Sequence, residues 1–181
     1  MTTAIALEPE ELFHKGKWSV RDLALTLDKA RDLWEKYNEH RTLFTDLSKG
    51  NLENWVRFVT DPDSFWLELV DTETGETVGL MYFRGMEQIV DIEMHAVTFD
   101  RKPAEKLELV REIIKWMFAN FPINRITAPT ASIYFSTKRL LERAGLTHEG
   151  VRREALLIGG KWVDRVWYGI TRSEVEKTYG R

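Results

Sequence analysis

"KRLLERAGLTHEGVRREALLIGGKWVDRVWYGITRSE", residues 138–174, contains a helix, the signal that ends it and a hairpin in one continuous run. Residues 132–145 have the pattern of a helix that stops at Gly145, because glycine readily takes the left-handed conformation found after a helix C-terminus. Two runs of strand-forming residues follow, and Gly159-Gly160 between them is suited to a tight turn. We therefore expect the hairpin to return to a sheet and the helix to lie between two neighbouring strands.

The chain before this segment shows further strands and helices. In order we expect a strand at 23–27, a helix with Asp28 at its N-cap, a short helix that closes at Asp61-Pro62, a hairpin within 64–85, a strand within 88–99, a helix within 103–121 and a strand at 125–129. The order is thus strand, two helices, three strands, helix, strand, helix and two strands. No repeat or flexible linker interrupts it, so we expect a single domain over residues 1–181.

Composition excludes several classes of function. Lys and Arg total 26 against 29 for Asp and Glu, so no positive excess attracts nucleic acid or an anionic membrane. The sequence has no cysteine, which rules out disulfides, thiolate zinc sites and cysteine nucleophiles. The first residues, "MTTAIALEPEEL", lack the basic and apolar regions of a signal peptide. We expect a cytoplasmic protein without nucleic-acid or membrane partners.

The C-terminal segment resembles the GNAT superfamily of N-acetyltransferases, most closely its branch that acetylates the N-terminal amines of ribosomal proteins. The matching residues are Arg139, Leu141, Glu142, Gly145, Glu149, Gly150, Arg153, Gly160, Asp164 and Tyr168. The resemblance is strong over residues 125–172, moderate over 64–124 and limited to element order before that. Many of the matching residues are ones that any such architecture requires, so the resemblance supports the fold more than the chemistry.

The resemblance implies an α/β (α+β) fold: a mixed, mostly antiparallel sheet of six to seven strands, with helices on both faces. It also implies a V-shaped splay between the fourth and fifth strands, here near 90–99 and 125–129, where acetyl-CoA lies. The pantetheine arm of acetyl-CoA pairs with a bulge late in the fourth strand, so Val97, Thr98 and Phe99 inherit that role by position.

The pyrophosphate loop of the superfamily is glycine-rich, whereas the corresponding stretch here is "FDRKPAEKL". Pro103 removes one of the amide donors that would hold the anion. Arg101, Lys102 and Lys106 could neutralise the diphosphate through their side chains, with Ala104 in the same loop. The alternative is that the three cations are ordinary solvated charges. Thr137, in the following helix, stands where the superfamily has a serine near the cofactor.

The acid and base candidates lie on the strand within 88–99. Asp91 and Glu93 share one face of it, where burial beside a like charge would raise an acid's pKa and suit it to accept a proton from the amine. Alternatively they line a solvated face or pair with an arginine. His95 is on the same face. Tyr134 replaces the asparagine that usually opens the next helix and is the candidate proton donor to the departing thiolate; its alternative role is core packing.

Other groups carry weaker signals. The acids of the first hairpin turn, Asp71, Glu73 and Glu76, lack EF-hand spacing, and the four histidines are dispersed, so we expect no metal. Trp18, Trp55 and Trp162 border the acceptor side in the superfamily and could shape a substrate pocket or a protein-binding surface; core packing is the alternative.

Two functions follow. The first is acetyl transfer from acetyl-CoA to a primary amine, which could be a protein N-terminus, a lysine or a small amine, by direct attack in a ternary complex. The second is a catalytically degenerate GNAT fold that serves as a protein-binding or assembly module. The acceptor has no readable code in residues 36–55 or 158–167, and the protein could be a monomer or a homodimer.

Overall fold

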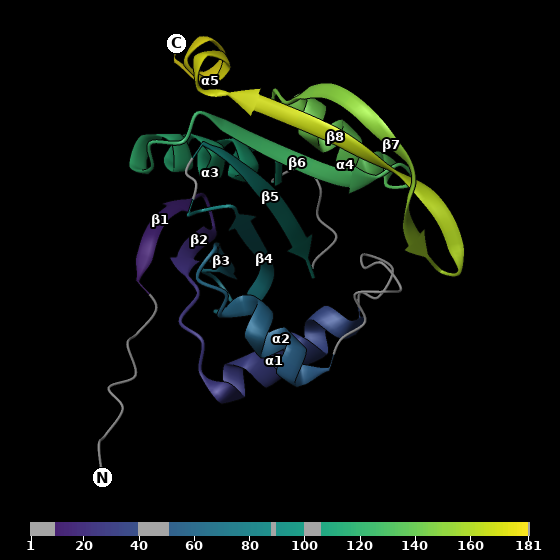
Figure 1. Ribbon diagram of the computed structural model, residues 1–181. Coiled ribbons are helices and arrows are strands. Elements are labelled where there is room, and N and C mark those ends of the chain that lie inside the picture. The colour runs from purple at the N-terminus through teal and green to yellow at the C-terminus, as the bar shows by residue number, and fades with distance from the viewer. Residues whose placement is uncertain (1–9, 40–50, 88–89, 100–105, 181) are drawn as a thin grey trace.

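A computed structural model describes residues 10–39, 51–87, 90–99 and 106–180. One eight-stranded sheet, in the order β1-β2-β3-β4-β5-β6-β8-β7, forms the centre, and only β5 and β6 pair in parallel (Figure 1). The strands are β1 Glu11–Lys15, β2 Trp18–Asp22, β3 Ser64–Asp71, β4 Thr77–Arg84, β5 Asp91–Thr98, β6 Arg125–Ala131, β7 Thr147–Ile158 and β8 Lys161–Thr171. The helices are α1 Leu27–Glu39, α2 Leu52–Val59, α3 Lys106–Asn120, α4 Phe135–Arg143 and α5 Arg172–Tyr179. The mixed, mostly antiparallel sheet is confirmed, with one strand more than the upper limit expected.

The extra strand comes from an N-terminal hairpin that sequence reasoning missed. The expected strand at 23–27 is wrong, because β1 and β2 pair antiparallel through Lys15↔Trp18 and end before it. Gly16, at φ +60°, makes the turn between them, a conformation that glycine adopts without steric cost. The helix start is also corrected: Thr26 Oγ1, and not Asp28, accepts the hydrogen bond from a first-turn amide.

Helices α1 and α2 lie together against one face of β3–β5 (Figure 1). Leu33 and Tyr37 of α1 are buried with Trp55 and Val59 of α2, as their helical spacing predicts. Glu68 of β3, only 2% exposed, accepts hydrogen bonds from Lys29 of α1 and from Thr77 of β4. A buried carboxylate satisfied in this way holds the two-helix layer in place over the sheet.

The opposite face of the sheet carries the larger core. Leu107, Val110, Ile114 and Met117 of α3 are all buried there, which confirms the helical stripe read from the sequence. Apolar residues of β4, β5, β6 and β8 pack against this stripe. The sheet is therefore sandwiched, with α1 and α2 on one face and α3 and α4 on the other.

The splay between the fourth and fifth strands of the superfamily is present as a divergence of β5 from β6. The two strands pair only through three residues each, from Asp91↔Arg125 to Glu93↔Thr127. Beyond that point β5 continues to Thr98 and β6 to Ala131 without Cα partners between them in the described chain. The divergence is visible in Figure 1 and opens the middle of the sheet.

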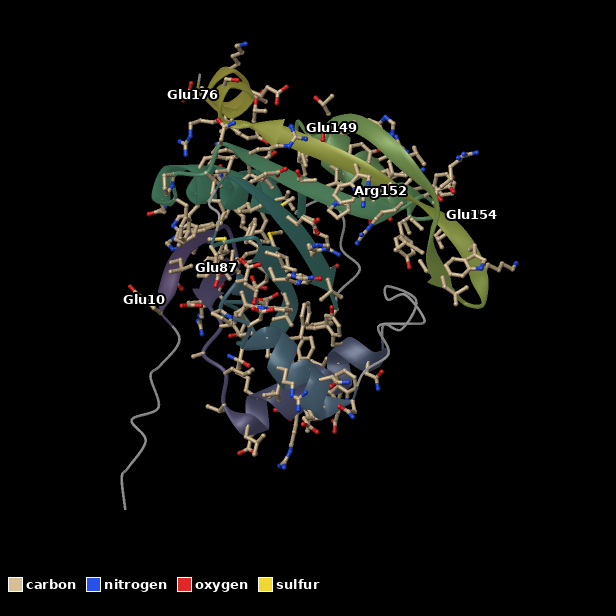
Figure 2. All side chains as sticks on the ribbon, in the orientation of Figure 1. Glu10, Glu87, Glu149, Arg152, Glu154 and Glu176 are labelled. Atoms are coloured by element: carbon tan, nitrogen blue, oxygen red, sulfur yellow. The ribbon has the colours of Figure 1, made fainter. Side chains whose placement is uncertain are left out.

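The C-terminal segment folds as its sequence indicates. Gly145 has φ +90° directly after α4, and the long β7–β8 hairpin turns at Gly159-Gly160. A short helix that we did not expect, α5, follows, with the Glu174 carboxylate accepting from the Thr171 backbone N–H. Figure 2 shows Glu149, Arg152 and Glu154 along β7, the edge strand, where charged side chains disfavour pairing with another chain.

Several residues that carried the resemblance make structural contacts. Glu142 accepts a hydrogen bond from the buried Tyr168 hydroxyl at 3.0 Å, and Glu149 pairs with Arg125. The Asp164 carboxylate accepts from the backbone N–H of Glu154, which has φ +49° at an irregularity in β7. These residues thus support the hairpin and its helix, as expected of a motif that specifies architecture.

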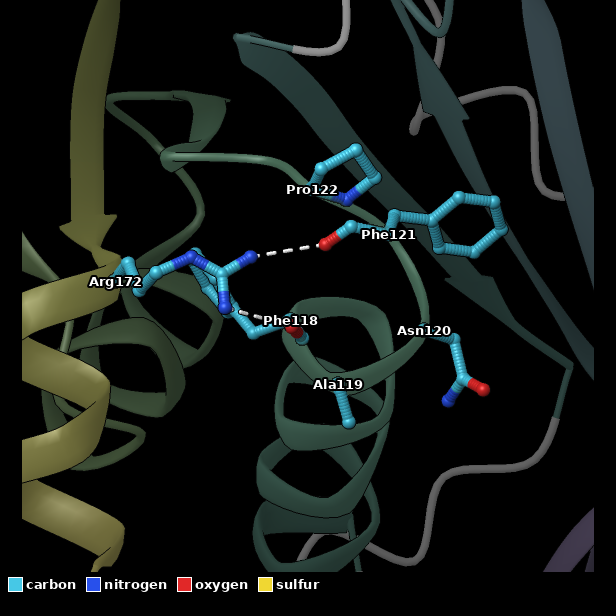
Figure 3. Close-up of a pocket in the computed structure, with 6 residues that line it drawn as sticks. All are labelled: Phe118, Ala119, Asn120, Phe121, Pro122 and Arg172. Carbon is cyan, nitrogen blue, oxygen red and sulfur yellow. Dashed lines mark hydrogen bonds between the residues drawn. The ribbon is translucent and has the colours of Figure 1, made fainter.

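Arg172, the first residue of α5, closes the C-terminal end of α3. Its guanidinium donates to the carbonyl oxygens of Phe118 and Phe121 at 2.9 Å, as Figure 3 shows, and to that of Ile123 at 2.7 Å. A cation at this position satisfies the orphaned carbonyls and opposes the negative end of the helix dipole. The hollow of about 430 Å³ around it is lined by α3, its C-terminal turn and Arg172, so it is part of a structural joint.

None of the helices in the described part of the chain combines the length and the apolar character needed to cross a bilayer.

Candidate functional site

A cavity of about 640 Å³ lies where β5 and β6 diverge. Its walls come from both sides of the sheet: Trp34, Tyr37, Trp55, Phe58, Tyr82, Arg84, Glu93 and His95 from the α1–α2 side, and Met81, Met94, Val110, Leu140 and Leu141 from the α3–α4 side. Residues 128–131 of β6, Tyr134, Thr137 and three residues of the β7–β8 hairpin complete the lining. Because the splay removes the hydrogen bonds between the two strands, the cavity reaches from one face of the sheet to the other.

The edge of β5 that borders the cavity offers unpaired backbone groups. The Phe99 N–H donates to the Val78 carbonyl of β4 at 2.7 Å, so alternate residues before it also bond toward β4. By the same alternation, the backbone groups of Ala96 and Thr98, which lie beyond the last β5–β6 pair at Glu93↔Thr127, point toward the splay. These groups can pair with an extended ligand that lies between the strands.

The bulge implied for this strand is not found in its paired region. Strands β4 and β5 stay in register from Arg84↔Glu93 to Gly79↔Thr98. A Cβ built on Gly79 would lie 2.8 Å from the Val97 carbonyl oxygen, so glycine permits this close and regular approach. Val97 lines the cavity, whereas Phe99 packs against the α1–α2 cluster.

The loop that would carry the diphosphate is only partly described. Arg101, Lys102 and Ala104 lie outside the described residues, so their predicted role in binding stays a prediction. Lys106 begins α3, and its Nζ donates to Thr98 Oγ1 at 2.7 Å. This contact brings one expected cation to the end of β5, beside the backbone groups that face the splay.

Asp91 takes part in an ion-pair network at the start of β5. It accepts a hydrogen bond from Thr127 Oγ1 at 2.7 Å and lies 3.6 Å from Arg125 Nε. Its side chain is 53% exposed, and it is not among the residues that line the cavity. The structure therefore matches the alternative reading for Asp91, an acid paired with an arginine.

Glu93 does line the cavity, and its carboxylate interacts with His95. The His95 Nε2 and Glu93 Oε2 atoms are 3.2 Å apart. This hydrogen bond from His95 lowers the pKa of Glu93 below its ordinary value, and it outweighs the opposing effect of burial. The raised pKa expected for an acid at this position is thus wrong, because the nearest partner is an imidazole and not a second carboxylate.

His95 is itself held by aromatic stacking. Its ring lies 4.7 Å from that of Tyr82, and Tyr82 stacks on Trp66 at 4.3 Å. These three residues stand side by side on β5, β4 and β3 and face the α1–α2 layer. Stacking and the bond to Glu93 fix the orientation of the imidazole in the cavity wall.

Tyr134 lies directly before α4, in the wall of the cavity. Its hydroxyl is buried and has no hydrogen-bond partner in the described protein, and burial raises the pKa of Tyr134. A buried hydroxyl without a partner costs free energy, so it indicates a place where a bound ligand completes the hydrogen bonding. Thr137, one helical turn further on, lines the same cavity.

The tryptophans named from the sequence separate into three environments. Trp55 is buried and lines the cavity, and its indole N–H donates to the Ala30 carbonyl. Trp18 is buried in the core on the opposite face, and Trp162 is 59% exposed on β8. Neither Trp18 nor Trp162 contributes to the cavity lining.

Sequence reasoning missed several cavity residues, among them Phe58, Tyr82, Arg84 and Arg165. They come from α2, β4 and β8, which are distant in the chain. Alternation along β4 could have placed Tyr82 and Arg84 on one face, but no local signal marks that face as the wall of a cavity.

With the fold and the cavity described, the chain can be compared with known proteins. No family model matches the sequence. The SPbeta prophage-derived uncharacterized N-acetyltransferase YokL of Bacillus subtilis is 22% identical over 142 residues, which cover 74% of this chain and 76% of that protein.

Among solved structures, the spermidine N-acetyltransferase of Vibrio cholerae in complex with CoA and spermine superposes with a TM-score of 0.75 and 15% identity, covering 88% of this chain and 98% of that one. The ribosomal-protein-S5-alanine acetyltransferase of Vibrio fischeri gives 0.70 and 17%, covering 88% and 95%. The chain has the GNAT acetyltransferase fold. In this fold the splay between β5 and β6 is the expected feature, and the cavity lies in it.

Proposed function

We propose that the protein is an acetyl-CoA-dependent N-acetyltransferase that transfers an acetyl group to a primary amine. The observation that carries the proposal is the cavity through the splayed sheet, with the unpartnered Tyr134 hydroxyl in its wall. Two reactants can enter such a cavity from opposite faces of the sheet and meet in its middle. Holding them in contact supplies much of the rate acceleration that acyl transfer needs.

The residues of the α3–α4 side fit acetyl-CoA, which supplies the reactive thioester when it is bound. The backbone groups of Ala96 and Thr98 face the splay and suit an amide-bearing chain laid along β5. Lys106 lies at the end of this track through its contact with Thr98, where a cation would meet a phosphate. Arg101 and Lys102 are proposed to join it there.

The α1–α2 side supplies groups that can handle protons. The amine nitrogen must lose a proton as it forms its bond to the carbonyl carbon, and the sulfur must gain one as the carbon–sulfur bond breaks. Glu93 and His95 form a pair that can accept the amine proton, directly or through water. Tyr134 is the proposed donor to the sulfur. Asp91 is paired outside the cavity and is the weaker candidate.

The nature of the acceptor is supported only in outline. One similar structure is named for spermidine and another for the alanine of a ribosomal protein, so the fold accommodates small and protein-borne amines. We propose a primary amine, with a protein N-terminus among the acceptors that the sequence resemblance implies.

A second function, that of a binding or assembly module, is favoured by one observation in the sequence. The stretch "FDRKPAEKL" has no glycine, and Pro103 lacks the N–H that a phosphate would accept from. A chain that had lost acetyl-CoA binding would keep the fold and the cavity but would not respond to the nucleotide.

Thermal unfolding with added acetyl-CoA separates these two functions. A ligand at 100 times its dissociation constant stabilises the folded state by about 2.7 kcal/mol. For a chain of this size that corresponds to a rise in Tm of roughly 5–10 °C. We expect such a rise with acetyl-CoA and with CoA, and competition between the two.

Reversing the charge of one residue in the predicted diphosphate loop tests whether the rise in Tm depends on that loop. Arg101→Glu should abolish the rise in Tm while leaving the unliganded Tm unchanged, and Lys161→Glu, on the exposed β7–β8 turn, should keep it. No rise at millimolar acetyl-CoA would contradict the enzyme and favour the binding module.

A further inference from the structure

Two arginines line the α1–α2 side of the cavity, and neither has a hydrogen-bonded or ion-paired partner among the described residues. Arg84 comes from β4 and Arg165 from β8, and the charges of both act on Glu93 and Tyr82. In the described chain neither guanidinium donates a hydrogen bond or lies within 4.0 Å of a carboxylate. Arg84 is exposed and Arg165 is half-buried, so water can solvate both guanidinium groups, and a ligand that brings a negative charge into the cavity can replace this water with charge-assisted hydrogen bonds.

The lack of a carboxylate bonded to Arg84 is not explained by the absence of a neighbouring acid. Glu93 stands directly opposite Arg84 in the ladder between β4 and β5, where an ion pair would be the ordinary outcome. The Glu93 carboxylate instead bonds to His95. Arg84 remains without a bonded carboxylate, although one lies on the neighbouring strand.

Aromatic rings hold both guanidinium groups in place. The Cζ atom of Arg84 lies 5.9 Å from the ring centroid of Phe58, and that of Arg165 lies 5.3 Å from Trp167. Contact with a ring face orients an arginine but leaves its in-plane N–H donors available. Two oriented forks of donors suit the oxygens of a carboxylate.

The other residues that line the α1–α2 side of the cavity indicate the chemical character of the rest of the ligand. Trp34, Trp55, Phe58 and Tyr82 contact one another in series, with ring centroids 5.2–6.3 Å apart. Glu93 is the one carboxylate among the described lining residues, against two arginines. A polyamine, which carries several positive charges, would be repelled by this balance, whereas an apolar amine with a negative group would be favoured.

The geometry points to an acceptor amine that carries a carboxylate on an apolar or aromatic body, with Arg84 and Arg165 as the residues that bind the carboxylate. This inference rests on the proposed function and specifies its acceptor. The carboxylate then lies on the arginine side of the cavity, and the amine reaches Glu93 and His95. The two arginines contribute specificity, because a ligand without the negative group leaves them unpaired.

Binding of a matched pair of amines tests this without requiring turnover. Phenylalanine and phenylalanine amide differ only in the charged group, and spermidine provides the polycation. Calorimetric titration of each into the protein, free and saturated with CoA, should show phenylalanine binding at least tenfold tighter than the amide, with spermidine weakest. Equal binding of the acid and the amide, or tighter binding of spermidine, would overturn the inference.

Variants assign the preference to particular residues. Arg84→Gln and Arg165→Gln should each remove most of the preference for the acid over the amide. Arg152→Gln is the matched control, since Arg152 also lies over the Trp167 ring, at 4.7 Å, but does not line the cavity. A preference that survives Arg84→Gln and Arg165→Gln to the same degree as Arg152→Gln contradicts the assignment.

The test of the carboxylate site and the test of the proposed acetyltransferase activity can be passed or failed separately. Acetyl transfer to spermidine but not to phenylalanine would retain the enzyme and reject the carboxylate site. Absence of any CoA binding would reject the enzyme, and the amine titrations on the free protein would still decide whether the arginines bind a carboxylate.

Discussion

Tyr134 and Tyr168 contain the same phenol in two different settings. The Tyr168 hydroxyl donates to the Glu142 carboxylate at 3.0 Å and ties β8 to α4. The Tyr134 hydroxyl is buried in the cavity wall without a described partner. Removing the first should change stability, because a hydrogen bond is lost, whereas removing the second should change reactivity, because the folded protein makes no use of it.

Substitution of each tyrosine by phenylalanine tests this contrast. Tyr134→Phe should lower kcat by about 100-fold, in the range typical of a lost general acid, while the Tm of the unliganded protein does not fall, because the hydroxyl that is removed has no described partner. Tyr168→Phe should lower the free energy of unfolding by about 1 kcal/mol and leave kcat within twofold. Steady-state kinetics and urea unfolding of both variants provide the check; a Tyr134→Phe enzyme with full kcat would remove Tyr134 from the reaction.

At the scale of the elements, a single arginine joins three of them. Arg172 starts α5, and its guanidinium donates to the carbonyls of Phe118 and Phe121 at the end of α3 and of Ile123 before β6. Helix α3 supplies the buried stripe of the larger core and, through Val110, part of the cavity wall. The joint in Figure 3 therefore helps to set where α3 lies under the splay.

Arg172→Ala should weaken this joint. Its charge-assisted hydrogen bonds are lost and the helix carbonyls are left unsatisfied, so we expect the free energy of unfolding to fall by about 2 kcal/mol. Arg139→Ala, which removes an exposed arginine of α4, is the control and should stay within about 0.5 kcal/mol of the parent protein. Urea unfolding monitored by tryptophan fluorescence measures both. Equal stability of the two variants would show that the Arg172 contacts contribute nothing.

At the scale of the whole molecule, the splay determines how two substrates can meet. The cavity is lined from both faces of the sheet, so the two substrates of the proposed reaction would have separate approaches to a common centre. The sequence contains no cysteine that could carry the acetyl group between them. Direct transfer within a ternary complex is the mechanism that this arrangement supports.

Initial-rate kinetics test the ternary complex. Varying both substrates should give intersecting double-reciprocal plots, and acetyl-CoA incubated without amine should release no thiol in the first turnover. Parallel plots, together with a burst of CoA equal to the enzyme concentration, would instead show a covalent acetyl-enzyme and contradict direct transfer.

The sequence by itself determined the features that depend on neighbours in the chain. The stripe of Leu107 and Ile114, the stop at Gly145 and the turn at Gly159-Gly160 are visible because helical spacing and glycine conformation are local properties. The N-terminal hairpin escaped notice because its short strands turn at one isolated glycine, Gly16, between charged residues.

Only the tertiary structure decided which side chains share the cavity. The Tyr134 hydroxyl, which has no partner in the described chain, and Arg84 together with Arg165 are brought to one cavity where β4, β5, α4 and β8 meet. Sheet order brings these strands together regardless of their distance in sequence. The charge of the cavity wall depends on which strands and helices meet there, which no local pattern of residues encodes.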